Sequence, residues 1–139
     1  MSKEGGIKNM KIVNFNLDGL RLKGVSDEVQ GGIEFDNGWI MCDCHYQDCC
    51  ESVYADWNHL KDEAGINYDF NEETFHIESV DEGIRFGDNG VMFFVPCYNE
   101  QNGYYNSDLI IQMYRKRPDG SYIRLRRFSI SAGTINNIY

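Results

Sequence analysis

Apolar residues recur at every second position along much of the chain, and short turn sequences interrupt them. Alternating apolar and polar side chains are typical of strands that bury one face, and Asn-Gly or Asp-Gly pairs readily adopt the backbone angles of tight turns. We therefore expect many short strands joined by hairpins. The predicted strands are two within Lys11–Gly24, folded around Leu17-Asp18-Gly19, and then Gly32–Phe35, Trp39–Cys42, Thr74–Val80, Gly83–Phe86, Val91–Cys97, Asp108–Arg117 and Tyr122–Ile130.

Two hairpins are indicated most clearly by the sequences of their turns. Asp36-Asn37-Gly38 separates the second predicted pair of strands, and Pro118-Asp119-Gly120 separates the last pair. The run Val91–Val95 is continuously apolar, as expected for a strand that is buried on both faces.

One short helix is expected between the strands. Asp56 can cap a helix that starts at Trp57, with Leu60 and Ala64 at helical spacing and Gly65 suited to the position after the helix. Such a helix is only about two turns long and would cover one face or one open end of the sheet.

These elements predict a mainly β fold of the α+β type: an antiparallel, curled sheet with one short helix. The pattern leaves a barrel-like and a sandwich arrangement both open. With 139 residues, the chain is long enough for one domain with its own core. Residues 1–9 are polar and glycine-containing, so we expect a flexible leader there and a single β-rich domain over residues 10–139.

Composition and charge indicate the cellular compartment in which the protein is expected to act. No stretch reaches the roughly 18 apolar residues of a membrane span, and the first ten residues lack the apolar region of a signal peptide. We therefore expect a cytoplasmic protein with no membrane partner, in which the five cysteines form no disulfide framework. The net charge is −9, but residues 1–114 carry 7 basic and 21 acidic side chains, whereas residues 115–139 carry 6 basic and 1 acidic.

Four of the five cysteines lie within nine residues. For a metal site, Cys42 and Cys44 share one strand face, but the C-x2-C spacing that wraps zinc is missing and His45 would point to the opposite face. For catalysis, the thiol pKa must fall, whereas the neighbouring carboxylates raise it. The third interpretation, which we favour, is that most of these cysteines are small core residues and that the protein has no cofactor. The cluster comprises Cys42, Asp43, Cys44, His45, Asp48, Cys49, Cys50 and Glu51.

The segment HYQDCCESV, followed about fifty residues later by NGYYNSDL, resembles an uncharacterised family of small phage and prophage proteins. Members of that family share an H-x-Q-D-C-C-E-x-V segment and a later N-G-Y-Y segment, so the resemblance spans His45 to Leu109. It implies no known activity. This chain departs from the family in WNHLKDEAG and in its basic C-terminal hairpin. The matching positions are His45, Gln47, Asp48, Cys49, Cys50, Glu51, Val53, Asn102, Gly103, Tyr104 and Tyr105.

If the two family segments meet in space, their side chains would form one binding patch. Tyrosines in a loop supply contact area at low entropic cost, although they can equally cover the edge of a core. The predicted binding residues are His45, Asp48, Cys49, Cys50, Glu51, Asn102, Tyr104 and Tyr105.

Basic side chains lie on both arms of the last predicted hairpin. Strand alternation would place Tyr122, Arg124 and Arg126 on one face, as part of a continuous basic strip. Nucleic acid could bind such a strip, but the acidic remainder of the chain opposes long-range attraction, so we do not expect a nucleic-acid partner. The strip comprises Arg115, Arg117, Arg124 and Arg126, with Lys116 and Arg127 beside them.

Together these features predict a non-enzymatic accessory protein of the phage or prophage type. We expect a small binding or interaction module that uses a sheet edge or its aromatic loops. Its expected partner is a protein, either a different one or a second copy in a homodimer. The alternative is a metal-binding or cysteine-dependent protein centred on the CDCHYQDCCE segment.

Overall fold

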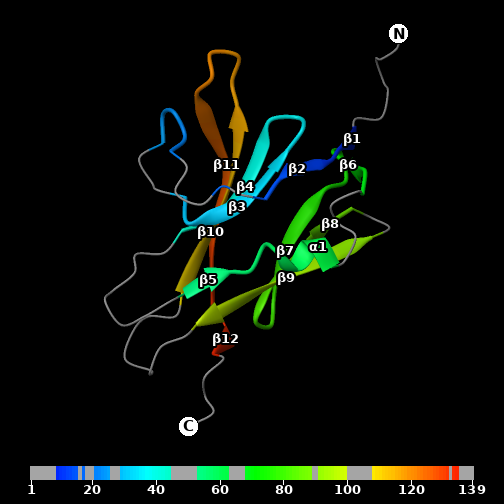
Figure 1. The fold of residues 1–139 in the computed structure, drawn as a ribbon, viewed down its shortest axis with the longest axis vertical. Helices are drawn as coiled ribbons and strands as arrows, with labels where there is room; N and C mark the ends of the chain where they lie inside the picture. Colours follow the sequence, from blue (N-terminus) through cyan, green and yellow to red (C-terminus); the bar gives the residue numbers. More distant parts are fainter. Residues whose placement is uncertain are drawn as a thin grey trace.

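The computed structural model describes residues 9–15, 17, 21–25, 29–44, 53–62, 68–88, 91–99, 108–131 and 133–134. Within these residues the chain is built mainly from strands, arranged in two larger sheets and one small two-stranded sheet, with one short helix (Figure 1). The predicted mainly β fold is confirmed. The sheets do not close into a barrel over this part of the chain, so the arrangement is a sandwich.

The first large sheet is antiparallel throughout and has the strand order β11-β10-β4-β3-β2. Both hairpins that the turn sequences predict are present in it, β3 with β4 and β10 with β11. Gly38 and Gly120 adopt φ angles of 93° and 89° in the two turns, which explains why glycine stands there. The strands are β2 (Ile12–Asn14), β3 (Gly31–Phe35), β4 (Trp39–Cys44), β10 (Asp108–Lys116) and β11 (Tyr122–Ser131).

The second large sheet is organised around its longest strand, β9. The predicted succession of three strands after residue 74 is confirmed as β7, β8 and β9, which pair in antiparallel order. The far end of β9 pairs with β5 in antiparallel and with β12 in parallel orientation. The strands are β5 (Val53–Ala55), β7 (His76–Val80), β8 (Gly83–Gly87), β9 (Met92–Asn99) and β12 (Gly133–Thr134); β1 (Asn9–Met10) and β6 (Phe70–Asn71) form the small sheet.

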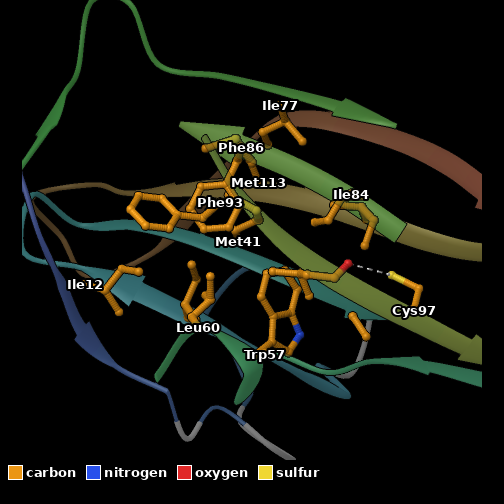
Figure 2. Close-up of a cluster of buried hydrophobic side chains, with 14 of the residues drawn as sticks. Ile12, Met41, Trp57, Leu60, Ile77, Ile84, Phe86, Phe93, Cys97 and Met113 are labelled. Atoms are coloured by element: carbon orange, nitrogen blue, oxygen red, sulfur yellow. Dashed lines mark hydrogen bonds between the residues drawn. The ribbon is translucent and has the colours of Figure 1, made fainter. Parts of the chain in front are cut away.

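The main core lies between the two large sheets. Met41 and Met113 of the first sheet face Phe86 and Phe93 of the second in the same cluster of buried side chains (Figure 2). A segment after β5 closes one side of this cluster with Trp57 and Leu60 (Figure 2). Apolar surface removed from water on both sheets therefore holds the two layers together.

The predicted hairpin over Lys11–Gly24 is wrong. β2 pairs with β3 instead, and residues 21–25 form no strand. Leu17, Leu22 and Val29 pack on the outer face of the first sheet, against a second cluster formed by Ile40, Cys42 and Tyr114. Alternation in the sequence reports which side chains are buried but not which strand is the partner, and β4 needs apolar cover on both of its faces.

The helix α1 (His59–Asp62) begins two residues later than predicted, and its predicted end lies outside the described residues. Its first hydrogen bond runs from the backbone N–H of His59 to the carbonyl of Asp56 at 3.2 Å. Trp57 and Leu60 are buried, as their spacing predicts, whereas Ala64 and Gly65 lie outside the described residues. The helix follows β5 and lies against β9 (Figure 1).

Candidate functional site

All eight residues of the predicted binding patch lie outside the part of the chain that the structure describes, so their roles remain predictions. They are His45, Asp48, Cys49, Cys50, Glu51, Asn102, Tyr104 and Tyr105. In the sequence, these residues lie between β4 and β5 and between β9 and β10.

Of the four clustered cysteines the structure describes two, and Cys42 fits the core interpretation whereas Cys44 is only half-buried. Cys42 and Cys97 are fully buried, Cys42 in the outer cluster and Cys97 in the main core. Burial, with a smaller contribution from the nearby Asp43 carboxylate, raises the pKa of Cys97 to about 12, so the thiol stays protonated at neutral pH. Cys44 is half-buried, and its sulfur accepts a hydrogen bond from Gln112 Nε2 at 3.2 Å. Among the described residues, no group of three His, Cys, Asp or Glu side chains is placed to hold a metal ion.

Asp43 is a buried carboxylate that the sequence pattern did not reveal. Its side chain is fully inaccessible to solvent, and its two oxygens accept three hydrogen bonds: from Trp57 Nε1 at 2.7 Å, from Gln30 Nε2 at 2.7 Å and from the Ala55 backbone N–H at 3.1 Å. Loss of solvation raises the pKa of this carboxyl to about 6, although each of the three donors favours the charged form. Asp43 therefore ties β4 to β5 and to the segment that leads into α1.

A pocket of about 300 Å³ lies beside this carboxylate. Its lining consists mainly of three aromatic rings, two amide side chains, one carboxylate and the backbone of two glycines. Gly31 separates the pocket from the buried carboxylate, because a Cβ atom at this position would lie 3.3 Å from both Asp43 Oδ1 and Trp57 Cδ1. The lining residues are Phe15, Gln30, Gly31, Gly32, Tyr54, Ala55, Asp56, Trp57 and Asn58.

None of the nine residues lining this pocket was singled out as a binding residue from the sequence. The sequence assigns Trp57 and Asp56 only to the helix start and Gly32 only to a strand, and it assigns Gly31 to no element. The available signal was the Gln30-Gly31-Gly32 run before an apolar strand, because paired glycines in a strand often mark a close approach of another group to the backbone.

The basic hairpin differs from its predicted geometry. The pairing of β10 with β11 shifts at Met113 and Tyr114, which lie opposite Arg126 and Arg124, so Leu125 is an extra, bulged residue. Because side chains alternate and the bulge adds one residue, Arg124 lies on the outer face with Tyr114, and Arg126 lies on the inner face with Met113. The prediction that Arg124 and Arg126 share one face is therefore wrong.

Arg115 and Arg117 lie at the end of β10 and in the following turn, and both are exposed. Arg124 Nη1 lies 3.4 Å from Gln112 Oε1, and the guanidinium of Arg126 lies 5.2 Å from the ring centroid of Phe128. The four arginines thus flank both faces of the hairpin and do not form one strip.

The fold and the site define a two-layer, mainly antiparallel β-sandwich with an aromatic pocket next to a buried carboxylate. No protein-family model, no curated protein and no solved structure matches the chain. The similarity to small phage and prophage proteins therefore remains a prediction from the sequence. No helix among the described residues is long and apolar enough to cross a membrane.

Proposed function

We propose that this protein is a small, non-enzymatic interaction module of the phage or prophage type, which acts in the cytoplasm and binds another protein chain along strand β11. The observation that supports this proposal is the position of β11. It has ten residues and, among the described residues, ends the strand order of the first sheet, with β10 as its neighbour on one side. Its first backbone N–H, at Tyr122, donates to the carbonyl of Lys23 at 2.9 Å, so the edge proposed for binding is the part of β11 that follows Tyr122. A strand at a sheet edge presents unpaired backbone groups to which an extended segment can add.

The side chains of β11 favour a particular kind of partner. Arg124, Leu125, Arg126 and Arg127 are exposed, and the bulge at Leu125 distributes the arginines over both faces of the edge. Pairing of this edge with a second copy of itself would bring like charges together, which is unfavourable. An extended segment rich in Asp and Glu would gain charge-assisted hydrogen bonds on both faces. We therefore favour an acidic segment of another protein over a homodimer.

The test is a titration with a fluorescent eight-residue peptide of alternating Glu and Val, followed by fluorescence anisotropy. We expect saturable binding that weakens steeply when the salt concentration rises to about 0.5 M, because exposed charges are screened. Hydrogen exchange should slow at the amides of β11 on peptide addition. The double change Arg124→Glu and Arg127→Glu should weaken binding at least about tenfold, which corresponds to two lost charge pairs.

The matched control is Lys11→Glu, which makes the same kind of charge change next to β2, at the opposite edge of the sheet. Its exposed ion pair with Asp69, at 3.6 Å, contributes little to stability. Equal weakening by Lys11→Glu, or peptide binding without protection of β11, would rule out the edge. Native mass spectrometry without chelator tests the homodimer, and it also reports any metal bound by the CDCHYQDCCE segment.

A further inference from the structure

The pocket beside Gly31 is lined by no described residue of β11. We propose that this pocket binds an ammonium or guanidinium group carried on an aliphatic stem. The stem would contact the aromatic rings, and the cationic head would lie near the carboxylates of Asp43 and Asp56.

The aromatic lining suits a cation with an apolar stem. The faces of Phe15, Tyr54 and Trp57 carry the negative part of the ring quadrupole, which attracts cations within about 6 Å. An ammonium of the protein itself already lies at this rim, because Lys61 Nζ is 5.6 Å from the ring centroid of Phe15. A volume of about 300 Å³ accommodates one amino-acid-sized group.

The negative charge around the pocket favours a positively charged ligand. Asp56 belongs to the lining, and Asp43 lies directly behind Gly31 without any solvent exposure. Among the described residues the ion pairs join other side chains, Lys11 with Asp69 and Arg85 with Glu78, and none neutralises Asp43. A negative charge in a medium of low dielectric acts over a longer distance than one in water, so it disfavours an anion and favours a cation in the pocket.

Glycine at position 31 leaves space between the pocket and the Asp43 carboxylate. Any side chain there would meet Asp43 Oδ1 and the Trp57 ring at 3.3 Å, between the pocket and the buried carboxylate. Because Trp57 donates its indole N–H to Asp43 Oδ1 at 2.7 Å, a cation that enters the pocket changes the electric field at this proton. The indole N–H of Trp57 is therefore a direct reporter of binding.

The experiment follows the indole N–H signals of the ¹⁵N-labelled full chain by NMR during titration with n-butylguanidinium. Its neutral analogue of the same shape, n-butylurea, is the ligand control. We expect a saturable shift of the Trp57 signal with a dissociation constant on the order of 1 mM, in line with the few kcal/mol available to so small a ligand. Trp39 pairs with Arg115 at the other end of β4 and should not respond.

Two variants should change the affinity in opposite directions. Asp56→Asn removes a carboxylate but retains the ability to cap the helix, and should weaken binding about fivefold. Lys61→Gln removes a competing ammonium from the rim, and should strengthen binding about twofold. Asp119→Asn, at the tip of the β10–β11 hairpin, makes the same charge change as Asp56→Asn far from the pocket and should leave binding unchanged.

Three results would overturn the proposal: n-butylurea shifting the Trp57 signal as much as the cation, Trp57 and Trp39 shifting together, or Asp56→Asn and Asp119→Asn having the same effect. An acetylated, amidated Gly-Arg-Gly peptide separates the sources of the ligand. Tighter binding of this peptide than of n-butylguanidinium assigns the cation to a protein partner, and equal or weaker binding assigns it to a free small amine. Neither result depends on whether β11 binds an acidic segment.

Discussion

Asp43 occupies a position in the middle of the sandwich where an apolar side chain would be expected. It follows the buried Met41 and Cys42 along β4, and its partner on β3 is Gly31. Burial of a carboxylate costs free energy unless hydrogen bonds replace its hydration, and here three donors do so. The carboxylate thereby fixes Trp57, which lines the pocket, relative to the first sheet.

We predict that Asp43 gives the protein a distinctive pH dependence. Its pKa is about 6 in the folded protein and 3.8 in its ordinary state, so the folded protein binds the proton more tightly. The contribution of Asp43 to the free energy of unfolding is therefore largest at low pH and falls as pH rises from about 4 to about 6. In Asp43→Asn this titration is absent. The difference between wild type and variant should grow in favour of wild type by about 2 kcal/mol from pH 7 to pH 4.

Urea unfolding followed by tryptophan fluorescence at several pH values measures this difference. Other carboxylates titrate in both proteins and cancel in the comparison. We also expect Asp43→Asn to be less stable at pH 7, because the amide N–H₂ would face at least one of the three donors. Parallel stability curves for the two proteins between pH 4 and pH 7 would contradict the prediction.

At the scale of single elements, the β10–β11 hairpin shows how one extra residue redirects a strand. Leu125 retains 39% of its accessible surface, while Tyr122 on one side of it packs against the outer cluster and Ile130 on the other side packs in the main core. The bulge reconciles these two demands, because a regular strand of this length would turn one of the two side chains to the wrong face.

We predict that deletion of Leu125 destabilises the protein although its side chain is exposed. Without the extra residue, a regular register turns either Tyr122 or Ile130 away from its cluster, which should lower the free energy of unfolding by about 1–3 kcal/mol. Leu125→Lys keeps the backbone and should change it by less than about 0.5 kcal/mol. Thermal unfolding of both variants is the measurement. A deletion variant as stable as Leu125→Lys would show that the bulge has no structural role.

The three predicted hairpins differ in how far their local sequences specify them. The turns at residues 36–38 and 118–120 have sequences that specify a tight reversal by themselves, and both were correct. The turn inferred from Leu17-Asp18-Gly19 has a similar local sequence, yet β2 pairs with β3 and Leu17 covers the outer face of the sheet. The pairing of this segment depends on the apolar side chains that cover the outer face of β4, and these come from parts of the chain outside β4.

At the scale of the whole molecule, an aromatic cluster joins the layers. The ring of Phe70 is fully buried, with five neighbouring ring centroids at distances from 4.9 to 5.8 Å. Its neighbours come from both large sheets and from the connections between them: Phe35, Tyr68, Phe75, Phe86 and Phe93. The two-residue strand β6 thus owes its place to packing more than to its short pairing with β1.

We predict that Phe70→Ala costs about 3–5 kcal/mol of stability, because it removes a buried ring and leaves a cavity between the sheets. Phe70→Leu fills most of that space and should cost clearly less, about 1–2 kcal/mol. Chemical unfolding measures both values. Equal, small losses for the two variants would mean that the two sheets do not depend on this cluster.

The sequence by itself determined three strands of the second sheet (β7, β8 and β9), two hairpins, the burial of Cys42 and the presence of a helix near Trp57. Each of these follows from local spacing or from turn chemistry within a few residues. The tertiary structure alone decided the pairing of β2 with β3, the faces of Arg124 and Arg126, and the pocket that Phe15, Gly31, Tyr54 and Trp57 form together. These features join residues far apart in the chain, and their energies come from contacts that exist only after the sheets have packed.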